Sequence, residues 1–305
     1  MEPFKIHILG CGSALPTLQH YASSQVVEIR NKLLMVDCGE GTQIALRRSH
    51  IRFTKISAVF ITHLHGDHFF GLIGMISTFG MLGRTAPLHV YAPSALQPVL
   101  EEQIEKFCFG LEYQVVFHTV KVNGKTVVYQ DDSIQVEAFP LNHRVECYGY
   151  LFSEKPTLPH INREMIDFYK IPVSQINNIK NGYDWQLPDG EVVANSRLVI
   201  KPEPPRSYAY CSDTKYMPSL SGLIQNVNLL YHESTYASED ILRAEKYYHS
   251  TAAQAAQTAS DAHAGQLLLG HYSARYDDEN KLLEEARTIF PDTILSSEGM
   301  VIDVK

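Results

Sequence analysis

The stretch ITHLHGDHFFGL, from Ile61 to Leu72, contains four potential metal ligands within six residues. It directly follows the strongly apolar run AVF at 58–60, which is typical of a buried strand. Imidazole nitrogen and carboxylate oxygen are both good ligands for Zn²⁺, which usually takes four. A single histidine is more often structural, but four such side chains at one strand end indicate a metal site: His63, His65, Asp67 and His68.

The spacing of these side chains predicts two metal ions rather than one. Alternate residues of a strand point the same way, so His63 and His65 project together. The glycine that follows lets the chain turn, and Asp67 and His68 then come round at the start of a helix predicted over 68–81. Because the second pair approaches from a different direction, the stretch is well shaped to serve two adjacent ions.

A two-metal site needs further ligands, and suitable residues follow later predicted strands. Active sites of α/β sheets gather at such strand ends. Each of these three residues alone is weak evidence, but they follow the first cluster in order. Together with its four members they give seven candidates, enough for two ions with one shared ligand. The three are His143 after strand 134–139, Asp213 after strand 208–211, and His271 after strand 267–269.

The rest of the chain alternates predicted strands with predicted helices, including one capped by Ser94, which favours layered α/β architecture in one domain, 1–305. The composition is 45% hydrophobic and 20% charged, as in ordinary globular proteins. The five cysteines form no CxxC pair, which favours reduced thiols. With no signal-peptide pattern and no long apolar span, we expect a soluble, cytoplasmic protein without a membrane partner.

One segment, residues 156–205, differs from the rest. It is rich in proline and asparagine and holds the only tryptophan, Trp185. A stretch of this length between two core-like regions predicts an insertion or lid, either a plain surface excursion or a functional arm.

Several motifs together resemble the ribonuclease Z family of the metallo-β-lactamase superfamily. HxHxDH by itself specifies only the superfamily, whereas HEST, HST and GHYSARY in succession are much narrower. The matching stretches span nearly the whole chain: VDCGEGTQ at 36–43, HLHGDH at 63–68, NHR at 142–144, SDT at 212–214, HEST at 232–235, HST at 249–251 and GHYSARY at 270–276.

The resemblance implies a fold, a cofactor and residue roles. The fold is an α/β, four-layer αβ/βα sandwich with an inserted flexible arm at 156–205, and the cofactor is two Zn²⁺ per chain. Asp37 is expected to orient a ligand histidine, and His249 to act as a catalytic proton donor, unless it merely precedes a helix capped by Ser250 and Thr251. The implied ligands are His63, His65 and His143 for one ion, Asp67, His68 and His271 for the other, and Asp213 as the bridge, with Asp67 also catalytic as proton acceptor.

The implied function is an endoribonuclease that removes the 3′ trailer from precursor tRNA, leaving a 3′-hydroxyl on the tRNA and a 5′-phosphate on the trailer. The arm is expected to grip the tRNA elbow from the other subunit of a homodimer. Two alternatives are another hydrolase of this fold (phosphodiesterase, arylsulfatase or thioesterase) and an inactive RNA-binding homologue. The complete ligand set argues against inactivity, and the HST and GHYSARY motifs argue against the other hydrolases.

The net charge of −8 is unusual for a protein that acts on RNA. Phosphate binding depends on the local field, however, and two zinc ions place four positive charges in the cleft. Basic side chains expected to add to this field are Arg47, Arg48, Arg52, Arg144 and Arg275.

Overall fold

The structure is a computed structural model that describes residues 2–15 and 17–305. The chain divides into two compact units. The larger unit consists of the residues up to Ser153 together with Arg206–Lys305, and the smaller unit is Glu154–Pro205.

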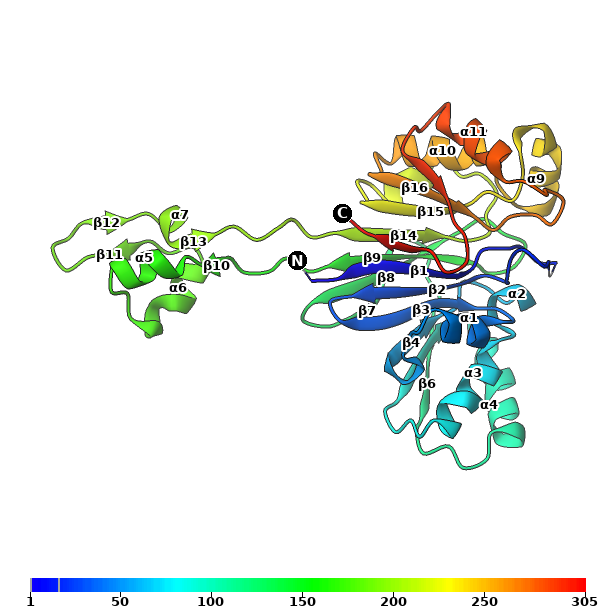
Figure 1. Cartoon of the computed structure of the whole chain (residues 1–305), viewed down its shortest axis with the longest axis horizontal. Coiled ribbons are helices and arrows are strands. Elements are labelled where there is room, and N and C mark those ends of the chain that lie inside the picture. Colours follow the sequence, from blue (N-terminus) through cyan, green and yellow to red (C-terminus); the bar gives the residue numbers. More distant parts are fainter. Residues whose placement is uncertain (1, 16) are drawn as a thin grey trace. The chain divides into compact units, whose positions relative to one another are not determined.

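The larger unit is built on two seven-stranded sheets (Figure 1). The first sheet has the strand order β18 (Val301–Asp303), β1 (Phe4–Gly10), β2 (Ser24–Ile29), β3 (Lys32–Cys38), β4 (Ile56–Phe60), β5 (Leu88–Ala92) and β6 (Val115–Thr119). The second has the order β17 (Thr293–Leu295), β16 (Gln266–Gly270), β15 (Leu229–Glu233), β14 (Ser207–Cys211), β9 (Tyr148–Glu154), β8 (Ile134–Pro140) and β7 (Thr126–Gln130).

Each sheet contains a run of parallel strands. Strands β3 to β6 pair in parallel in the first sheet, and β14 to β17 do so in the second. The carboxyl ends of parallel strands meet at one edge of a sheet, so residues distant in sequence are brought together there.

Helices cover the outer face of each sheet, which confirms the predicted four-layer arrangement. The first sheet packs on α1 (Thr42–Arg48), α3 (Leu72–Met81) and α4 (Leu96–Phe107) through a core that includes Leu46, Ile76 and Phe79. Outside the second sheet lie α9 (Ile241–Tyr247), α10 (Ala252–Asp261) and α11 (Asn280–Arg287) (Figure 1), and α8 (Leu220–Leu223) contacts α10.

Small side chains let α10 approach its sheet closely. Its buried face is made of alanines, among them Ala255 and Ala259, which join a core shared with both sheets. That core is filled by large aromatic side chains such as Phe60, Tyr150 and Phe152. Phe60 and Phe152 meet edge to face at 5.5 Å between ring centroids, an arrangement that aromatic pairs prefer.

Two expectations about helices were wrong. The helix predicted over 68–81 is two helices, α2 (Gly66–Phe69) and α3, because the chain turns at Gly71. A Cβ at Gly71 would lie 2.1 Å from the carbonyl oxygen of Gly39, so only glycine permits this close approach. Ser94 does not cap α4: its N-cap is Ala95, which makes no side-chain hydrogen bond.

The smaller unit has a core of its own, formed by Ile166, Ile171, Ile179, Val193 and Leu198. Its helices are α5 (Arg163–Phe168), capped by the Asn162 side chain, α6 (Ile176–Lys180) and α7 (Asn195–Leu198). Two short antiparallel pairs complete it: β10 (His160–Ile161) with β13 (Val199–Ile200), and β11 (Trp185–Gln186) with β12 (Val192–Val193).

Single 3₁₀ turns occur at Phe53–Lys55, Val173–Gln175 and Ser238–Asp240. Among the described residues, no helix is both long and apolar enough to cross a membrane.

Candidate metal centre

The seven ligand candidates converge at the carboxyl ends of the strands of both sheets. His63 and His65 follow β4, and Asp67 and His68 lie in α2. His143, Asp213 and His271 follow β8, β14 and β16 respectively. The structure therefore brings together every residue that the sequence analysis singled out as a metal ligand.

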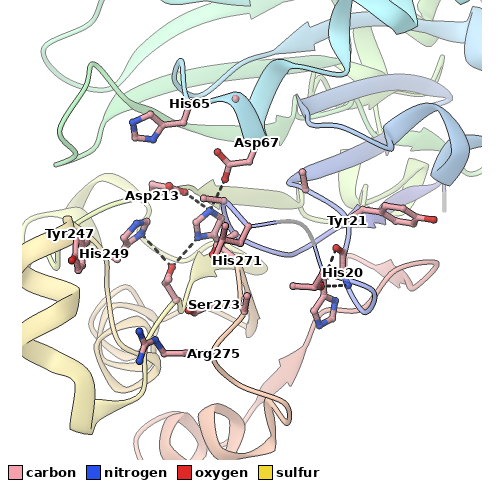
Figure 2. Close-up of a pocket in the computed structure, with 18 of the residues that line it drawn as sticks. His20, Tyr21, His65, Asp67, Asp213, Tyr247, His249, His271, Ser273 and Arg275 are labelled. Atoms are coloured by element: carbon pink, nitrogen blue, oxygen red, sulfur yellow. Dashed lines mark hydrogen bonds and ion pairs between the residues drawn. The ribbon is translucent and has the colours of Figure 1, made fainter.

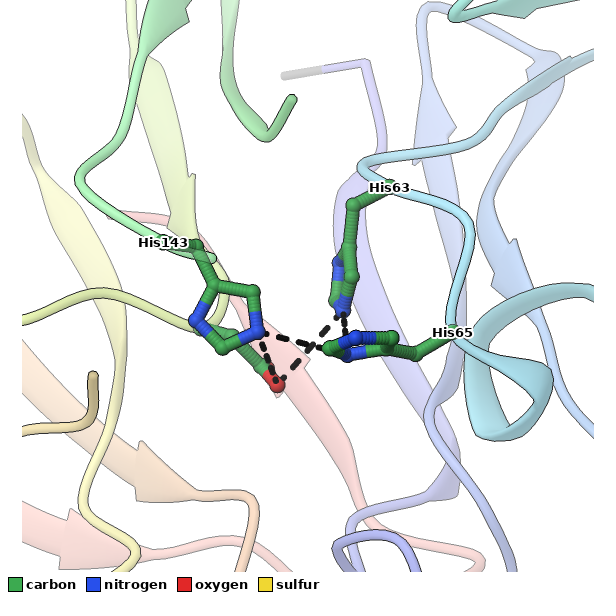
Figure 3. A group of neighbouring side chains, drawn as sticks. His63, His65 and His143 are labelled. Carbon is green, nitrogen blue, oxygen red and sulfur yellow. Dashed lines mark hydrogen bonds and ion pairs between the residues drawn. The ribbon is translucent and has the colours of Figure 1, made fainter. Parts of the chain in front are cut away.

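One group of donor atoms consists of three imidazoles and a carboxylate (Figure 3). His65 Nδ1 lies 3.0 Å from His63 Nε2 and 3.3 Å from His143 Nε2. The Oδ2 atom of Asp213 is 3.6 Å from His63 Nε2 and 3.9 Å from His143 Nε2. Four such donors facing a common point match the ligand number and types that Zn²⁺ prefers.

The second group lies on the other side of Asp213. Its Oδ1 atom is 3.1 Å from His271 Nε2 and 3.4 Å from His68 Nε2. Asp67 Oδ2 lies 3.6 Å and 3.3 Å from the same two nitrogens. Because each oxygen of Asp213 faces a different group, this carboxylate is placed to be shared between two ions.

Two buried nitrogens lack a hydrogen bond and so test whether the groups fit a metal. His68 Nε2 and His271 Nε2 are buried and, despite the nearby carboxylates, make no hydrogen bond of acceptable geometry. A buried polar atom left unpaired costs about 1–3 kcal/mol, so such atoms call for an explanation. A metal ligand needs its donor nitrogen free in this way. His271 also adopts a left-handed backbone conformation, with φ 60°, a strain that is commonly found at functional sites.

Four of the histidines are oriented through their other ring nitrogen. The Nδ1 atom of His68 donates to Asp37 Oδ2 at 2.8 Å, as expected for Asp37, and that of His143 donates to the Tyr248 carbonyl oxygen at 3.0 Å. Threonine hydroxyls accept from the remaining two, Thr62 from His63 at 3.0 Å and Thr235 from His271 at 2.9 Å. Such partners fix the tautomer that directs Nε2 at a metal.

The two threonines repeat one arrangement. The Thr62 hydroxyl donates to Asp37 at 3.0 Å, and the Thr235 hydroxyl donates to Glu233 at 2.7 Å. Each sheet thus supplies a buried carboxylate that orients a ligand candidate through a threonine. Thr62, Thr235 and Glu233 were not predicted from the sequence, although Thr62 lies in the stretch 61–72 and the other two lie in HEST.

Glu233 also holds His249. Its side chain is fully buried, and its Oε1 atom accepts from His249 Nδ1 at 3.0 Å and from the Ser250 backbone amide at 3.0 Å. Burial alone lowers the pKa of His249, but the charge of Glu233 and this hydrogen bond outweigh it and raise that pKa to about 9. Thr251 caps α10 in a capping box with Gln254, so His249 does precede a capped helix, but its ring is also held by Glu233.

A cavity of about 1080 Å³ opens above these groups (Figure 2). Five of the ligand candidates and His249 line it, whereas His63 and His68 lie beneath, fully buried. Of the arginines expected to face the cleft, Arg144 and Arg275 line the cavity and are joined by Arg243, while Arg47, Arg48 and Arg52 are not among its lining residues.

Comparison with known proteins assigns the chain to a family. A family profile described as anti-Pycsar protein Apyc1 matches residues 4–159. Proteins named ribonuclease Z from Bacteroides fragilis and Phocaeicola vulgatus are each 52% identical, over 304 and 305 residues; the alignments cover 100% of this chain and 100% and 99% of the relatives. One from Porphyromonas gingivalis is 48% identical over 304 residues, covering 100% of both chains.

Comparison with solved structures supports this assignment. The short form of human tRNase Z superposes with a TM-score of 0.73 at 25% identity, covering 99% of each chain. The metallo-β-lactamase fold protein YhfI from Bacillus subtilis superposes with a TM-score of 0.69 at 18% identity, covering 99% of this chain and 100% of YhfI. This chain has the metallo-β-lactamase fold and belongs to the ribonuclease Z family.

Proposed function

We propose that this chain is a zinc-dependent endoribonuclease that removes the 3′ trailer from tRNA precursors. Cleavage leaves a 3′-hydroxyl on the tRNA and a 5′-phosphate on the trailer. The observation that carries the proposal is the convergence of two ligand groups on Asp213, with His249 beside them at the floor of a wide cavity. The family relationship over the full length of the chain supports the choice of substrate.

The donor set fits two zinc ions. His63, His65 and His143 would hold the first, and Asp67, His68 and His271 the second, with Asp213 shared. Burial lowers the pKa of His63, which keeps its ring in the neutral form that binds metal. When bound, two zinc ions polarise the phosphodiester and make hydroxide available at neutral pH.

Asp67 is the proposed proton acceptor for the attacking water. Burial alone raises the pKa of Asp67, but the neighbouring rings of His68 and His271 hold that pKa well below its usual range. The carboxylate is therefore ionised, and it lines the cavity where the scissile phosphate must lie. Water oxygen bonds to phosphorus while its proton passes to Asp67.

His249 is the proposed proton donor for the departing 3′ oxygen. Glu233 keeps the ring protonated at neutral pH and fixes it through Nδ1, so that Nε2 is the nitrogen left to donate. As the bond from phosphorus to the 3′ oxygen breaks, this proton neutralises the leaving oxygen and gives the 3′-hydroxyl of the product.

Aromatic and basic side chains at the cavity suit single-stranded RNA. The Arg144 guanidinium lies 5.1 Å from the centre of the Tyr247 ring, and that of Arg275 lies 5.9 Å from the centre of the Tyr236 ring. Bases stack on aromatic rings while arginines contact phosphates. These local groups offset the overall charge of −8.

As part of the same proposal, the segment 156–205 is an exosite arm that contacts the tRNA elbow. The enzyme acts as a homodimer. The reaction takes place in the cytoplasm. The support for the arm is that Glu154–Pro205 forms a compact unit with a core of its own. From Leu151 to Pro205 there are six basic and seven acidic residues, so the arm would bind through its polar and aromatic side chains more than through net charge.

The test is to incubate the zinc-loaded protein with precursor tRNA labelled at either end and to map the product ends. We expect one cut at the base of the trailer, with a 3′-hydroxyl on the tRNA and a 5′-phosphate on the trailer, and no cut after metal removal. Hydrolysis of a small phosphodiester with no cleavage of the precursor would instead assign the chain to another hydrolase of this fold.

A further inference from the structure

A second cluster of metal-binding side chains lies outside the seven ligand candidates. It consists of Cys11, just after β1, His20, from the loop that follows, and Glu298, between β17 and β18. Cys11 Sγ lies 3.3 Å from His20 Nδ1 and 3.6 Å from Glu298 Oε1, and His20 Nδ1 lies 2.9 Å from Glu298 Oε2. Sulfur, nitrogen and oxygen donors thus meet around one point, although 287 positions in sequence separate Cys11 from Glu298.

The cluster is oriented as metal ligands are. Glu298 Oε1 accepts from the backbone amides of Cys11 and Tyr21, at 3.3 Å and 2.9 Å, which leaves Oε2 turned toward His20 Nδ1. The other ring nitrogen of His20, Nε2, donates to Glu279 Oε1 at 3.1 Å. A carboxylate behind a ligating histidine is the usual outer partner in zinc sites.

The cluster is buried enough to hold an ion and exposed enough for the ion to enter. Cys11 is fully buried, whereas the side chains of His20 and Glu298 keep 14% and 19% of their surface exposed. Burial and the charges of Glu298 and Glu279 raise the pKa of the Cys11 thiol well above its usual value. Without an ion the thiol is therefore protonated, and an ion that binds it must displace that proton.

We propose that Cys11, His20 and Glu298 form a third site for a divalent cation of the zinc type, with Glu279 orienting His20. Cys, His and carboxylate are the ligands that Zn²⁺ takes, and three protein ligands leave room for a water. Its ligands differ from those of the two-metal centre. Cys11 also supplies a thiol, which none of the seven ligand candidates has.

The position of the cation gives it a structural role. Cys11 and Ser13 form backbone hydrogen bonds with Tyr272, each 3.0 Å long, and Tyr272 directly follows His271. The loop from Cys11 to Tyr21 also supplies part of the cavity wall, including Ser13, Leu15 and Tyr21. An ion at the base of this loop would fix the wall against which the RNA lies.

Cobalt provides a probe that distinguishes this site from the proposed catalytic one. Thiolate bound to Co²⁺ gives an intense charge-transfer absorption in the near ultraviolet, whereas the seven candidate ligands of the two-metal centre offer only nitrogen and oxygen. Metal-free, reduced full-length protein is titrated with Co²⁺. We expect this absorption to develop with the amplitude of one thiolate per chain, and the apparent affinity to rise with pH because the ion displaces the thiol proton.

Two variants complete the experiment. Cys11→Ser should abolish the charge-transfer absorption and keep the weaker visible absorption of cobalt bound to nitrogen and oxygen. Cys108→Ser is the matched control, since Cys108 is also buried but lies at the end of α4, and it should leave the spectrum unchanged.

Absence of the absorption in the wild-type protein at saturating Co²⁺ would overturn the proposal, even if Cys11→Ser did not fold. Persistence of the absorption in folded Cys11→Ser would overturn it as well, because another cysteine would then be the ligand. Neither outcome depends on RNA cleavage, so this proposal and the proposed function can fail independently.

Discussion

Replacing Glu233 with glutamine removes the charge that keeps the proposed proton donor protonated. Glu233 is fully buried, and its Oε1 atom lies 3.0 Å from His249 Nδ1. Glutamine has nearly the same shape and retains one acceptor oxygen, but it carries no charge. The largely buried ring of His249 then loses the interactions that raise its pKa and keeps the burial that lowers it.

The size of the effect follows from the pKa of His249. That pKa is about 9 beside Glu233 and should fall to its ordinary value of 6.5 or lower in Glu233→Gln. A shift of this size corresponds to roughly 3 kcal/mol of lost stabilisation of the charged ring. At a pH near 8, the protonated fraction of His249 would fall from about nine-tenths to about one-thirtieth. Turnover should therefore fall roughly 30-fold there, and much less at pH values well below 6.5, where the ring becomes protonated in both proteins.

Two measurements check this. Nuclear magnetic resonance titration of the histidine ring protons in metal-free protein gives the pKa of His249 directly, and single-turnover cleavage of precursor tRNA across pH shows whether the alkaline limb moves to lower pH. Glu28→Gln is the control, since it breaks a similar contact, 3.0 Å from Glu28 to His7, outside the cavity. An alkaline limb at the same pH in wild type and Glu233→Gln, with His249 titrating normally in both, would refute the reasoning.

The remaining predictions concern the other residue roles. His249→Ala should keep its zinc content and lower turnover on precursor tRNA by about 10²–10⁴-fold, with little change in KM, whereas a substrate with a good leaving group should suffer less. A wild-type rate in this variant would remove the histidine from the mechanism. Asp67→Ala should lose both zinc and turnover, measured by metal analysis and single-turnover kinetics; full zinc content would exclude Asp67 as a ligand. Deletion of Pro156–Pro204 should impair cleavage of precursor tRNA far more than hydrolysis of bis-p-nitrophenyl phosphate, and equal losses would mean that the segment supports the fold.

Local patterns predicted individual strands well where burial sets a clear period. The strands predicted over 134–139, 208–211 and 267–269 match β8, β14 and β16 to within a residue or two. Strands β17 and β18 were not foreseen, because each has only three residues and is defined by its pairing with β16 or β1. The division of the helix at 68–81 was also missed, because the close approach of Gly71 to Gly39 depends on tertiary packing.

In the candidate site, too, some residues can be predicted from neighbouring sequence, whereas others depend on contacts between distant parts of the chain. The spacing of His63, His65, Asp67 and His68 is readable because one strand end carries all four. The glutamate of HEST carries no sign of its partner, since Glu233 and His249 are 16 residues apart and meet only once β15 and α10 are packed. Partnerships of this kind depend on the fold and cannot be inferred from motif spacing.

The central claim is that the cavity floor holds two zinc ions sharing Asp213. It is tested most directly by anomalous scattering at the zinc edge from crystals of the zinc-loaded protein. We predict two peaks on either side of Asp213, one among His63, His65 and His143 and the other among Asp67, His68 and His271. A single peak there, or none while zinc is bound elsewhere in the chain, would contradict the two-metal account.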